Sequence, residues 1–323
     1  MATTADSAPV GQASRTKQPR FSGMSHLSLP CRDLEESKIF YAQVMGGELV
    51  HEIKGFVEFR IEDIIIGLST QAEGWTDREA GYPHYAFDIS GSNFDLMKEW
   101  LDHHGVPNYP WRRDDTALMY FRDPSGNLFE LYCDTGYAGI ISLPLGPRRG
   151  GQSIDFSSLN YHWTGKRAEK EIPRPRFRAF AHASIPCRDL EQEKRFFTKV
   201  IGGELVHDAA GFAEIRVAGI ILGLSDRPGR STGRSAEYPH YAFFIEPEDF
   251  LPMATWLRQN GVTTSEPWTR DGIKGLLYFR DPAGNLFEMY CPKLKEAASF
   301  ARGAKQGGSY AIDFSSLSYE WNG

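Results

Sequence analysis

Residues 26–51 read HLSLPCRDLEESKIFYAQVMGGELVH, and residues 182–207 repeat them as HASIPCRDLEQEKRFFTKVIGGELVH. The similarity continues outward: YPHYAF stands at 82–87 and again at 238–243, and YFRDPSGNLFELYC at 120–133 returns at 278–291 as YFRDPAGNLFEMYC. Self-similarity at a nearly fixed spacing is the signature of an internal repeat. The chain is therefore predicted to be a tandem duplication of two halves.

The duplication predicts the domain organisation of the 323-residue chain. We expect a disordered tail over 1–20, a first module over 21–163, a linker over 164–178 and a second module over 179–323. The tail is small, polar and basic and lacks the apolar segment of a secretory signal. The linker, TGKRAEKEIPRPRFR, is charged and carries two prolines, which is typical of a connecting segment.

Composition excludes several classes of protein. Hydrophobic residues make up 41% of the chain, charged residues 24%, and the net charge is −6. These values indicate a soluble globular protein and argue against nucleic acid or a membrane as partner. Four scattered cysteines fit neither a disulfide scaffold nor a zinc site, so we expect a cytoplasmic protein.

Periodicity predicts the same elements twice in each half. MSHLSLP alternates as a strand does, Asp33 is placed as a helix cap, and apolar residues at helical spacing follow it. GELVHEI, GFVEFRI and DIIIGLS then predict three strands, and a second round starts at YPHYAFDI and continues through VPNYPW, ALMYFRD and NLFELYC. The predicted fold class is α+β, with four βαβββ units.

Three residue types on these strands suit a metal. His26 and His84 lie on the first strands of the first two units and Glu130 on a last strand, and the second half repeats them as His182, His240 and Glu288. Two imidazoles and one carboxylate form the facial triad, which leaves coordination positions open for substrate and O₂. A single histidine on a strand is more often structural, but a glutamate inside an apolar strand is unusual. We expect the three ligands of each half to line one curved sheet.

Other repeated residues are weaker candidates. Tyr120 and Tyr278 precede the glutamates, and each phenol is either a hydrogen-bond donor to substrate or core packing. Arg113 and Arg270 follow a tryptophan and are either anion contacts or loop residues. His51 and His207 end the GGELVH strands, either as proton carriers or as surface residues. IDFSSL at 154–159 and 312–317 is interpreted as an edge strand, a cap on the partner module or an oligomer contact.

The repeated unit with His, His and Glu resembles the vicinal oxygen chelate superfamily, which includes glyoxalase I, bleomycin-resistance proteins and type I extradiol dioxygenases. The resemblance covers 22–135 and 178–293 and implies two tandem cups, each built from two units around one metal. The run Leu277-Tyr278 through Asp281-Pro282 to Glu288 is similar to the end of the extradiol signature. The sequence departs from that pattern where a histidine is expected before the Leu-Tyr pair, and it lacks the acid–base histidine between the metal histidines.

The resemblance implies an Fe(II)-dependent extradiol-type ring-cleaving dioxygenase, with Mn(II) or Zn(II) as alternative metals. Its partners would be O₂ and a small catechol- or hydroquinone-like aromatic, and we expect a homo-oligomer. Tyr278 and Tyr120 would hydrogen-bond the substrate, and His207 or Arg270 would stand in for the missing histidine. The alternatives are a glyoxalase-type isomerase or lyase and a metal-free protein that binds an aromatic ligand.

Overall fold

A computed structural model describes residues 18–70, 79–146, 153–165, 172–227, 229, 231 and 233–319. Most of the expected tail, residues 1–17, and the middle of the expected linker, 166–171, lie outside the described residues. Within the described part of the chain, every helix is too short or too polar to cross a membrane.

Four βαβββ units follow one another along the chain, as the sequence predicts. The first contains β1 (Phe21–Pro30), α1 (Leu34–Gln43), β2 (Glu48–Ile53), β3 (Phe56–Ile61) and β4 (Ile64–Ser69). The second contains β5 (His84–Asp88), α2 (Gly91–His103), β6 (Asn108–Arg113), β7 (Thr116–Arg122) and β8 (Leu128–Cys133). The third contains β9 (Ala179–Pro186), α3 (Leu190–Arg195) with a π-helical extension (Phe196–Val200), β10 (Glu204–Ala209), β11 (Phe212–Val217) and β12 (Ile220–Ser225). The fourth contains β13 (His240–Ile245), α4 (Pro247–Gln259), β14 (Trp268–Thr269), β15 (Gly275–Arg280) and β16 (Leu286–Cys291), and β17 (Ala301–Arg302) follows it.

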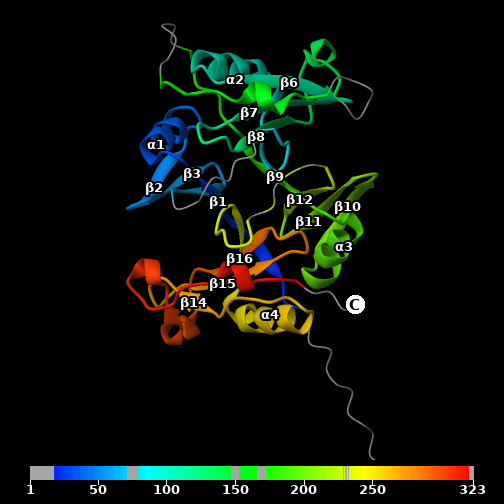
Figure 1. The fold of residues 1–323 in the computed structure, drawn as a ribbon. Helices are drawn as coiled ribbons and strands as arrows, with labels where there is room; N and C mark the ends of the chain where they lie inside the picture. The colour runs from blue at the N-terminus through cyan, green and yellow to red at the C-terminus, as the bar shows by residue number, and fades with distance from the viewer. Residues whose placement is uncertain are drawn as a thin grey trace, which may run out of the picture.

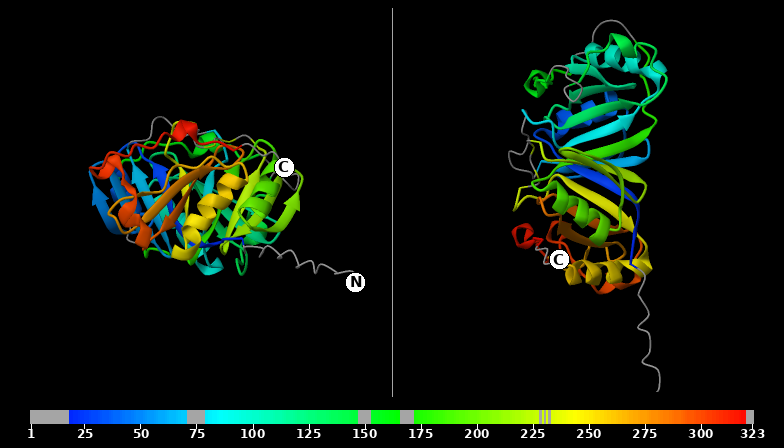
Figure 2. Two further views of the ribbon diagram at one scale, coloured as in Figure 1. Left: turned by 90° about the horizontal axis from the view of Figure 1, so that it is seen from below. Right: turned by 90° about the vertical axis from the view of Figure 1, so that its right-hand side faces the viewer.

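The units pair across the two halves of the chain. One sheet has nine strands in the order β17-β14-β15-β16-β13-β1-β4-β3-β2, so the first unit joins the fourth. The other sheet has eight strands in the order β10-β11-β12-β9-β5-β8-β7-β6, so the third unit joins the second. Figure 1 shows the second and fourth units at opposite ends of the molecule and the first and third between them, and Figure 2 shows the strands from two further sides. The α+β class with two tandem modules of two units each is confirmed, but each of the two sheets combines one unit from each half.

Antiparallel strand pairs join the halves. Strand β1 pairs with β13, with His26 opposite Ala242, and β9 pairs with β5, with His182 opposite Ala86. Beside the second pair, Arg178 donates two hydrogen bonds to Asp88, from its side chain to the carboxylate (2.9 Å) and from its backbone N–H to the carbonyl (2.8 Å). The position in β13 that corresponds to Asp88 is Phe244, which offers no carboxylate. This contact therefore favours β5 as the partner of β9.

Apolar side chains divide between a shared core and the two cups. One cluster draws residues from all four units, including Tyr85 and Tyr241, whose buried rings lie 6.4 Å apart between centroids. Two smaller clusters lie on the opposite strand faces, around Trp111 and Tyr120 in one cup and around Trp268 and Tyr278 in the other. Alternation along each strand separates the two kinds of face. The cups are thus lined independently of the core that holds them together.

One difference between the halves is a pair of buried carboxyl groups. Glu193, on α3, is 1% exposed, and its Oε1 accepts a hydrogen bond from the Ala283 N–H at 2.7 Å. Its Oε2 accepts none among the described residues. Burial raises the pKa of Glu193 well above its ordinary value and that of the neighbouring Asp281 to about 7. The corresponding residue in the first half is Ser37, which carries no charge.

Replacing Glu193 with Gln should stabilise the protein, and more so as the pH rises. A carboxyl whose pKa is raised by folding is stable in its site at low pH and loses that stability as the pH rises through the folded value. We expect the free energy of unfolding of E193Q to exceed that of the unmodified protein by about 1–3 kcal/mol at pH 8, with a much smaller difference at pH 4.5. Thermal unfolding at both pH values measures this, with Ser37→Ala as the control without a pH effect. Equal differences at the two pH values would contradict the prediction.

Candidate metal centres

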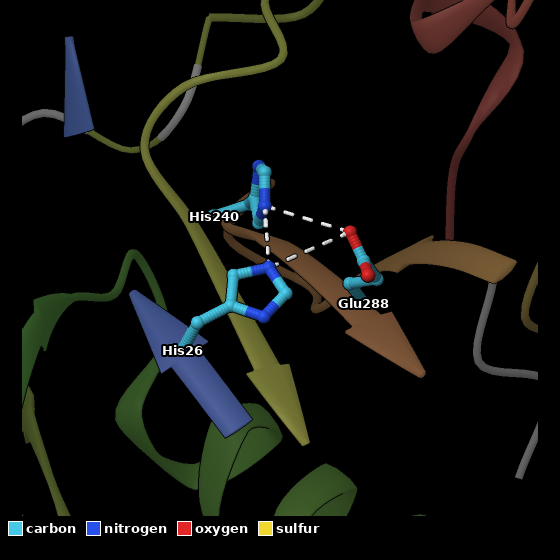
Figure 3. Close-up of side chains that lie close together, drawn as sticks. All are labelled: His26, His240 and Glu288. Carbon is cyan, nitrogen blue, oxygen red and sulfur yellow. Dashed lines mark hydrogen bonds and ion pairs between the residues drawn. The ribbon is translucent and has the colours of Figure 1, made fainter. Parts of the chain in front are cut away.

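Centre A consists of His26, His240 and Glu288, which converge from three neighbouring strands (Figure 3). The Nε2 atoms of the two histidines lie 3.3 Å apart, and the Glu288 carboxylate lies 3.8 Å from His26 and 3.5 Å from His240. All three side chains are buried, with Glu288 wholly inaccessible. Strand β1 supplies His26, while β13 and β16 supply the other two.

Centre B consists of His84, Glu130 and His182 and has the same design. The carboxylate of Glu130 lies 3.6 Å from Nε2 of His84 and 3.5 Å from Nε2 of His182. His84 and Glu130 are buried, and His182 is partly exposed, with 16% of its side chain accessible. Strands β5 and β8 of the second unit provide two ligands and β9 of the third unit provides one.

The structure brings together all six residues singled out in the sequence, but not in the grouping expected there. The expectation that His26, His84 and Glu130 share one cup is wrong, as is the corresponding group in the second half. Strand β1 pairs with β13 instead of β5, so His26 joins the residues of the fourth unit and His182 joins those of the second. Each centre therefore takes one histidine from one half and a histidine and a glutamate from the other.

Hydrogen bonds to the far ring nitrogens orient the histidines. Nδ1 of His84 lies 2.8 Å from the carbonyl of Gly81, and Nδ1 of His240 lies 2.9 Å from that of Glu237. An N–H at Nδ1 that donates to these carbonyls leaves the lone pair on Nε2, which faces the centre. Burial also lowers the pKa of His240 to about 4 and those of His26 and His182 well below the ordinary value. The imidazoles of His26, His182 and His240 are therefore neutral at pH 7, as metal ligands must be.

The surroundings of Glu288 indicate whether a cation fits between the three side chains of centre A. Both of its carboxylate oxygens are buried, and neither accepts a hydrogen bond within the described residues. A buried carboxylate that accepts no hydrogen bond is costly, and here burial raises its pKa to about 7 although the Arg270 charge lowers it. A divalent cation between Glu288 and the two Nε2 atoms would satisfy all of these atoms at once. The donor set of two nitrogens and one oxygen suits Fe(II), Mn(II) or Zn(II).

A cavity of about 300 Å³ opens onto centre B. Trp111, Tyr120, Phe156 and Phe212 line it, together with the three ligands of the centre. Phe156 belongs to the repeated IDFSSL segment and meets the Tyr120 ring edge-on at 5.3 Å, and Phe314 does the same to Tyr278. The two IDFSSL segments therefore pack over the aromatic residues of the cups. The sequence alone did not decide between an edge strand, a cap on the partner module and an oligomer contact.

The other predicted residues differ in their distance from the centres. Tyr120 and Tyr278 stand opposite Glu130 and Glu288 in the strand register, with their rings 5.4 Å from those of His84 and His240. Arg270 lies at centre A, where its charge affects His26 and Glu288. His207 is exposed on the edge strand β10 and does not line the cavity of centre B.

Two acidic residues near the centres, Glu58 and Glu214, are not among the residues predicted from the sequence. Glu58 lies on β3 and Glu214 on β11. In each case the strand belongs to the half of the chain that supplies only one histidine to the centre. Glu214 also lines the cavity of centre B. Glu58 Oε1 lies 4.0 Å from the Arg270 guanidinium. The repetition of GFVEFR at 55–60 as GFAEIR at 211–216 was the available signal.

Comparison with known proteins places these observations in context. Residues 23–131 and 179–289 match the profile of the Glyoxalase/Bleomycin resistance protein/Dioxygenase superfamily. Metallothiol transferase FosB of Lysinibacillus sphaericus is 32% identical over 116 residues, which are 35% of this chain and 82% of that protein. Biphenyl-2,3-diol 1,2-dioxygenase 2 of Rhodococcus globerulus is 29% identical over 152 residues, which are 44% of this chain and 78% of that protein. The structure of glyoxalase I from Zea mays covers 84% of this chain and 92% of its own, with a TM-score of 0.56 at 15% identity.

Double substitutions should reveal that the halves share their centres. Replacing His26 with Ala and Glu288 with Gln damages centre A alone, so about one metal per chain should remain. Replacing His26 with Ala and Glu130 with Gln damages both centres, so almost none should remain. Elemental analysis after loading with Fe(II) or Zn(II) measures the ratio, and circular dichroism checks that both variants fold. The reverse result would show that each half builds its own centre.

Proposed function

Because the chain belongs to the Glyoxalase/Bleomycin resistance protein/Dioxygenase superfamily, we propose that it is an Fe(II)-dependent extradiol-type ring-cleaving dioxygenase. Its substrates would be O₂ and a small catechol- or hydroquinone-like aromatic. The observation that carries the proposal is the ligand set: each centre has two histidines and one glutamate, with no fourth ligand among the described residues. Such a set leaves room for a substrate that binds through two neighbouring oxygens.

A bound Fe(II) would supply open coordination positions and the redox chemistry that O₂ requires. His26, His240 and Glu288 would hold it in centre A, and His84, Glu130 and His182 in centre B. The protein adds a cavity walled by aromatic side chains, which suits a planar ring and limits the access of water. Trp111 and Tyr120 stack nearly parallel, at 16° and 5.9 Å between centroids, and form one such wall.

The tyrosines act as hydrogen-bond donors in this scheme. Burial raises the pKa of Tyr278 and of Tyr120 well above the ordinary value, and the neighbouring glutamate adds to the effect in each case. Both phenols therefore keep their protons at neutral pH. Each can donate a hydrogen bond to a substrate oxygen that develops negative charge, which is the contribution that stabilises such a transition state.

The two side chains proposed to replace the missing acid–base histidine would act differently. Burial opposes the charge on Arg270, but Glu288, Tyr278 and Glu58 raise its pKa above the ordinary value. The guanidinium therefore stays charged, and it would stabilise an anionic substrate oxygen without exchanging protons. His207 is exposed on β10 and does not line the cavity of centre B, so it would exchange protons with a substrate only through solvent.

A thiol transferase is the second candidate function. The favouring observation is the 32% identity with the metallothiol transferase FosB. A glyoxalase-type isomerase or lyase with a fourth protein ligand is less well supported, because β4 and β12 carry no carboxylate or amide side chain. A metal-free binding protein would leave both oxygens of the buried Glu288 carboxylate without a hydrogen bond.

Oxygen uptake by Fe(II)-loaded protein tests the proposal. We expect O₂ consumption that depends on a catechol or hydroquinone and disappears in the double variant E130Q/E288Q. The double variant Y120F/Y278F should lose about 100-fold in kcat, because one donor to the developing anion is removed from each centre. Tyr137→Phe is the control, since that phenol bonds to Asp95 on the outer helix α2. Conversion of a thiol without O₂ consumption would move the assignment to the transferase.

A further inference from the structure

The duplication allows the two centres to be compared position by position. Around each ligand set, both cups carry the same tryptophan, arginine, tyrosine, phenylalanine and glutamate. A difference stands at the mouth, where Gly81 of centre B corresponds to Glu237 of centre A. Their carbonyls have the same task, since each accepts from the Nδ1 of a ligand histidine. The side chains therefore change the mouth and leave the ligands in place.

At centre A the cations are paired within the protein. Arg270 lies 4.0 Å from the Glu58 carboxylate. Lys305 forms an ion pair with Glu237 and lies over the ring of Tyr238, 5.7 Å from its centroid. The Glu237 carboxylate is largely buried, with 18% of its side chain exposed. Of the described residues at this mouth, Arg270 and Lys305 thus each have a carboxylate partner.

At centre B two arginines lie at the mouth without an ion pair among the described residues. Arg113, at the end of β6, and Arg227, just after β12, both line the cavity that contains His84, Glu130 and His182. Among the described residues, neither guanidinium lies within 4.0 Å of a carboxylate, although the carboxylates of Glu79 and Glu214 line the same cavity. Gly81 has no side chain that could pair with these arginines. The Phe156 ring occupies the space beside it, since a Cβ at Gly81 would lie 2.7 Å from ring atoms of Phe156. Two guanidinium groups therefore remain available to a ligand.

We propose that the two centres select substrates of different charge. Centre B takes a molecule that carries a carboxylate in addition to its metal-chelating oxygens, and centre A takes the uncharged counterpart. A guanidinium binds carboxylate oxygens through charge-assisted hydrogen bonds, and more strongly inside a concave site than in open water. At centre A the same carboxylate would have to displace Glu58 or Glu237. This inference rests on the proposed chelation of a small oxygen-bearing substrate.

Proteins with one intact centre provide the test. Glu288→Gln leaves centre B, and Glu130→Gln leaves centre A. Both are loaded with Zn(II), which is redox-inert, and titrated calorimetrically with 3,4-dihydroxybenzoate and with catechol. At centre B we expect the benzoate to bind at least tenfold more tightly, the size of one charge-assisted hydrogen bond. At centre A the two dissociation constants should agree within about threefold.

Arg227→Gln in the centre B protein tests whether the preference for the carboxylate-bearing compound depends on the arginines at the mouth. This residue is exposed and its loss should not affect folding, and the ratio of the two dissociation constants should fall at least threefold. Arg216→Gln is the matched control: this exposed arginine lies on β11 and pairs with Glu204 outside the cavity. Its ratio should equal that of the unmodified centre B protein.

The outcomes separate this inference from the proposed function. Equal ratios at the two centres, or a ratio unaffected by Arg227→Gln, would overturn the charge selection and leave the chelating function in place. Failure of both compounds to bind the zinc-loaded proteins, although zinc is present, would overturn the chelating function and this inference together.

Discussion

The pairing of β1 with β13, and of β9 with β5, is the contact on which the rest of this structure depends. Each pair joins a unit of one half to a unit of the other, and the first strand of a unit carries a histidine at that seam. If these strands separated, each centre would lose one of its three ligands. Assembly of the centres therefore requires both halves, because each group of candidate ligands found among the described residues combines residues of the two halves.

The strands bury apolar side chains on one face and polar side chains on the other. The outer faces contribute to one apolar core that spans both halves, while the inner faces hold carboxylates and imidazoles beside aromatic rings. Desolvation keeps the imidazoles neutral and works against the charge on Glu288. Burial of the apolar core offsets the unfavourable desolvation of the polar groups in the cups. The imidazoles of His84 and His240 are oriented by backbone carbonyls just before β5 and β13.

The two centres are nearly identical inside and different at the mouth. The candidate ligands, the tyrosine and the tryptophan recur in the same register, so the strand framework reproduces the arrangement of these side chains in each cup. Around the mouth the backbone keeps its role while the side chains change, as Gly81 and Glu237 show. One chain can therefore hold two centres with the same candidate metal-binding residues, while the charged side chains around the two mouths differ.

Much of this protein follows from its sequence alone. Alternation and helix caps predict the four units, and a glutamate inside an apolar strand, present twice, points to the ligands. What the sequence does not contain is the partner of each strand: residues 84–87 and 240–243 both read HYAF, so β1 has two equally suitable neighbours. Contacts far along the chain decide between them, among them the hydrogen bond of the Arg178 side chain to the Asp88 carboxylate, for which Phe244 offers no acceptor side chain. The residues of each centre are thus determined locally, but their grouping is determined by tertiary packing, because strand pairing depends on neighbours that the local pattern does not distinguish.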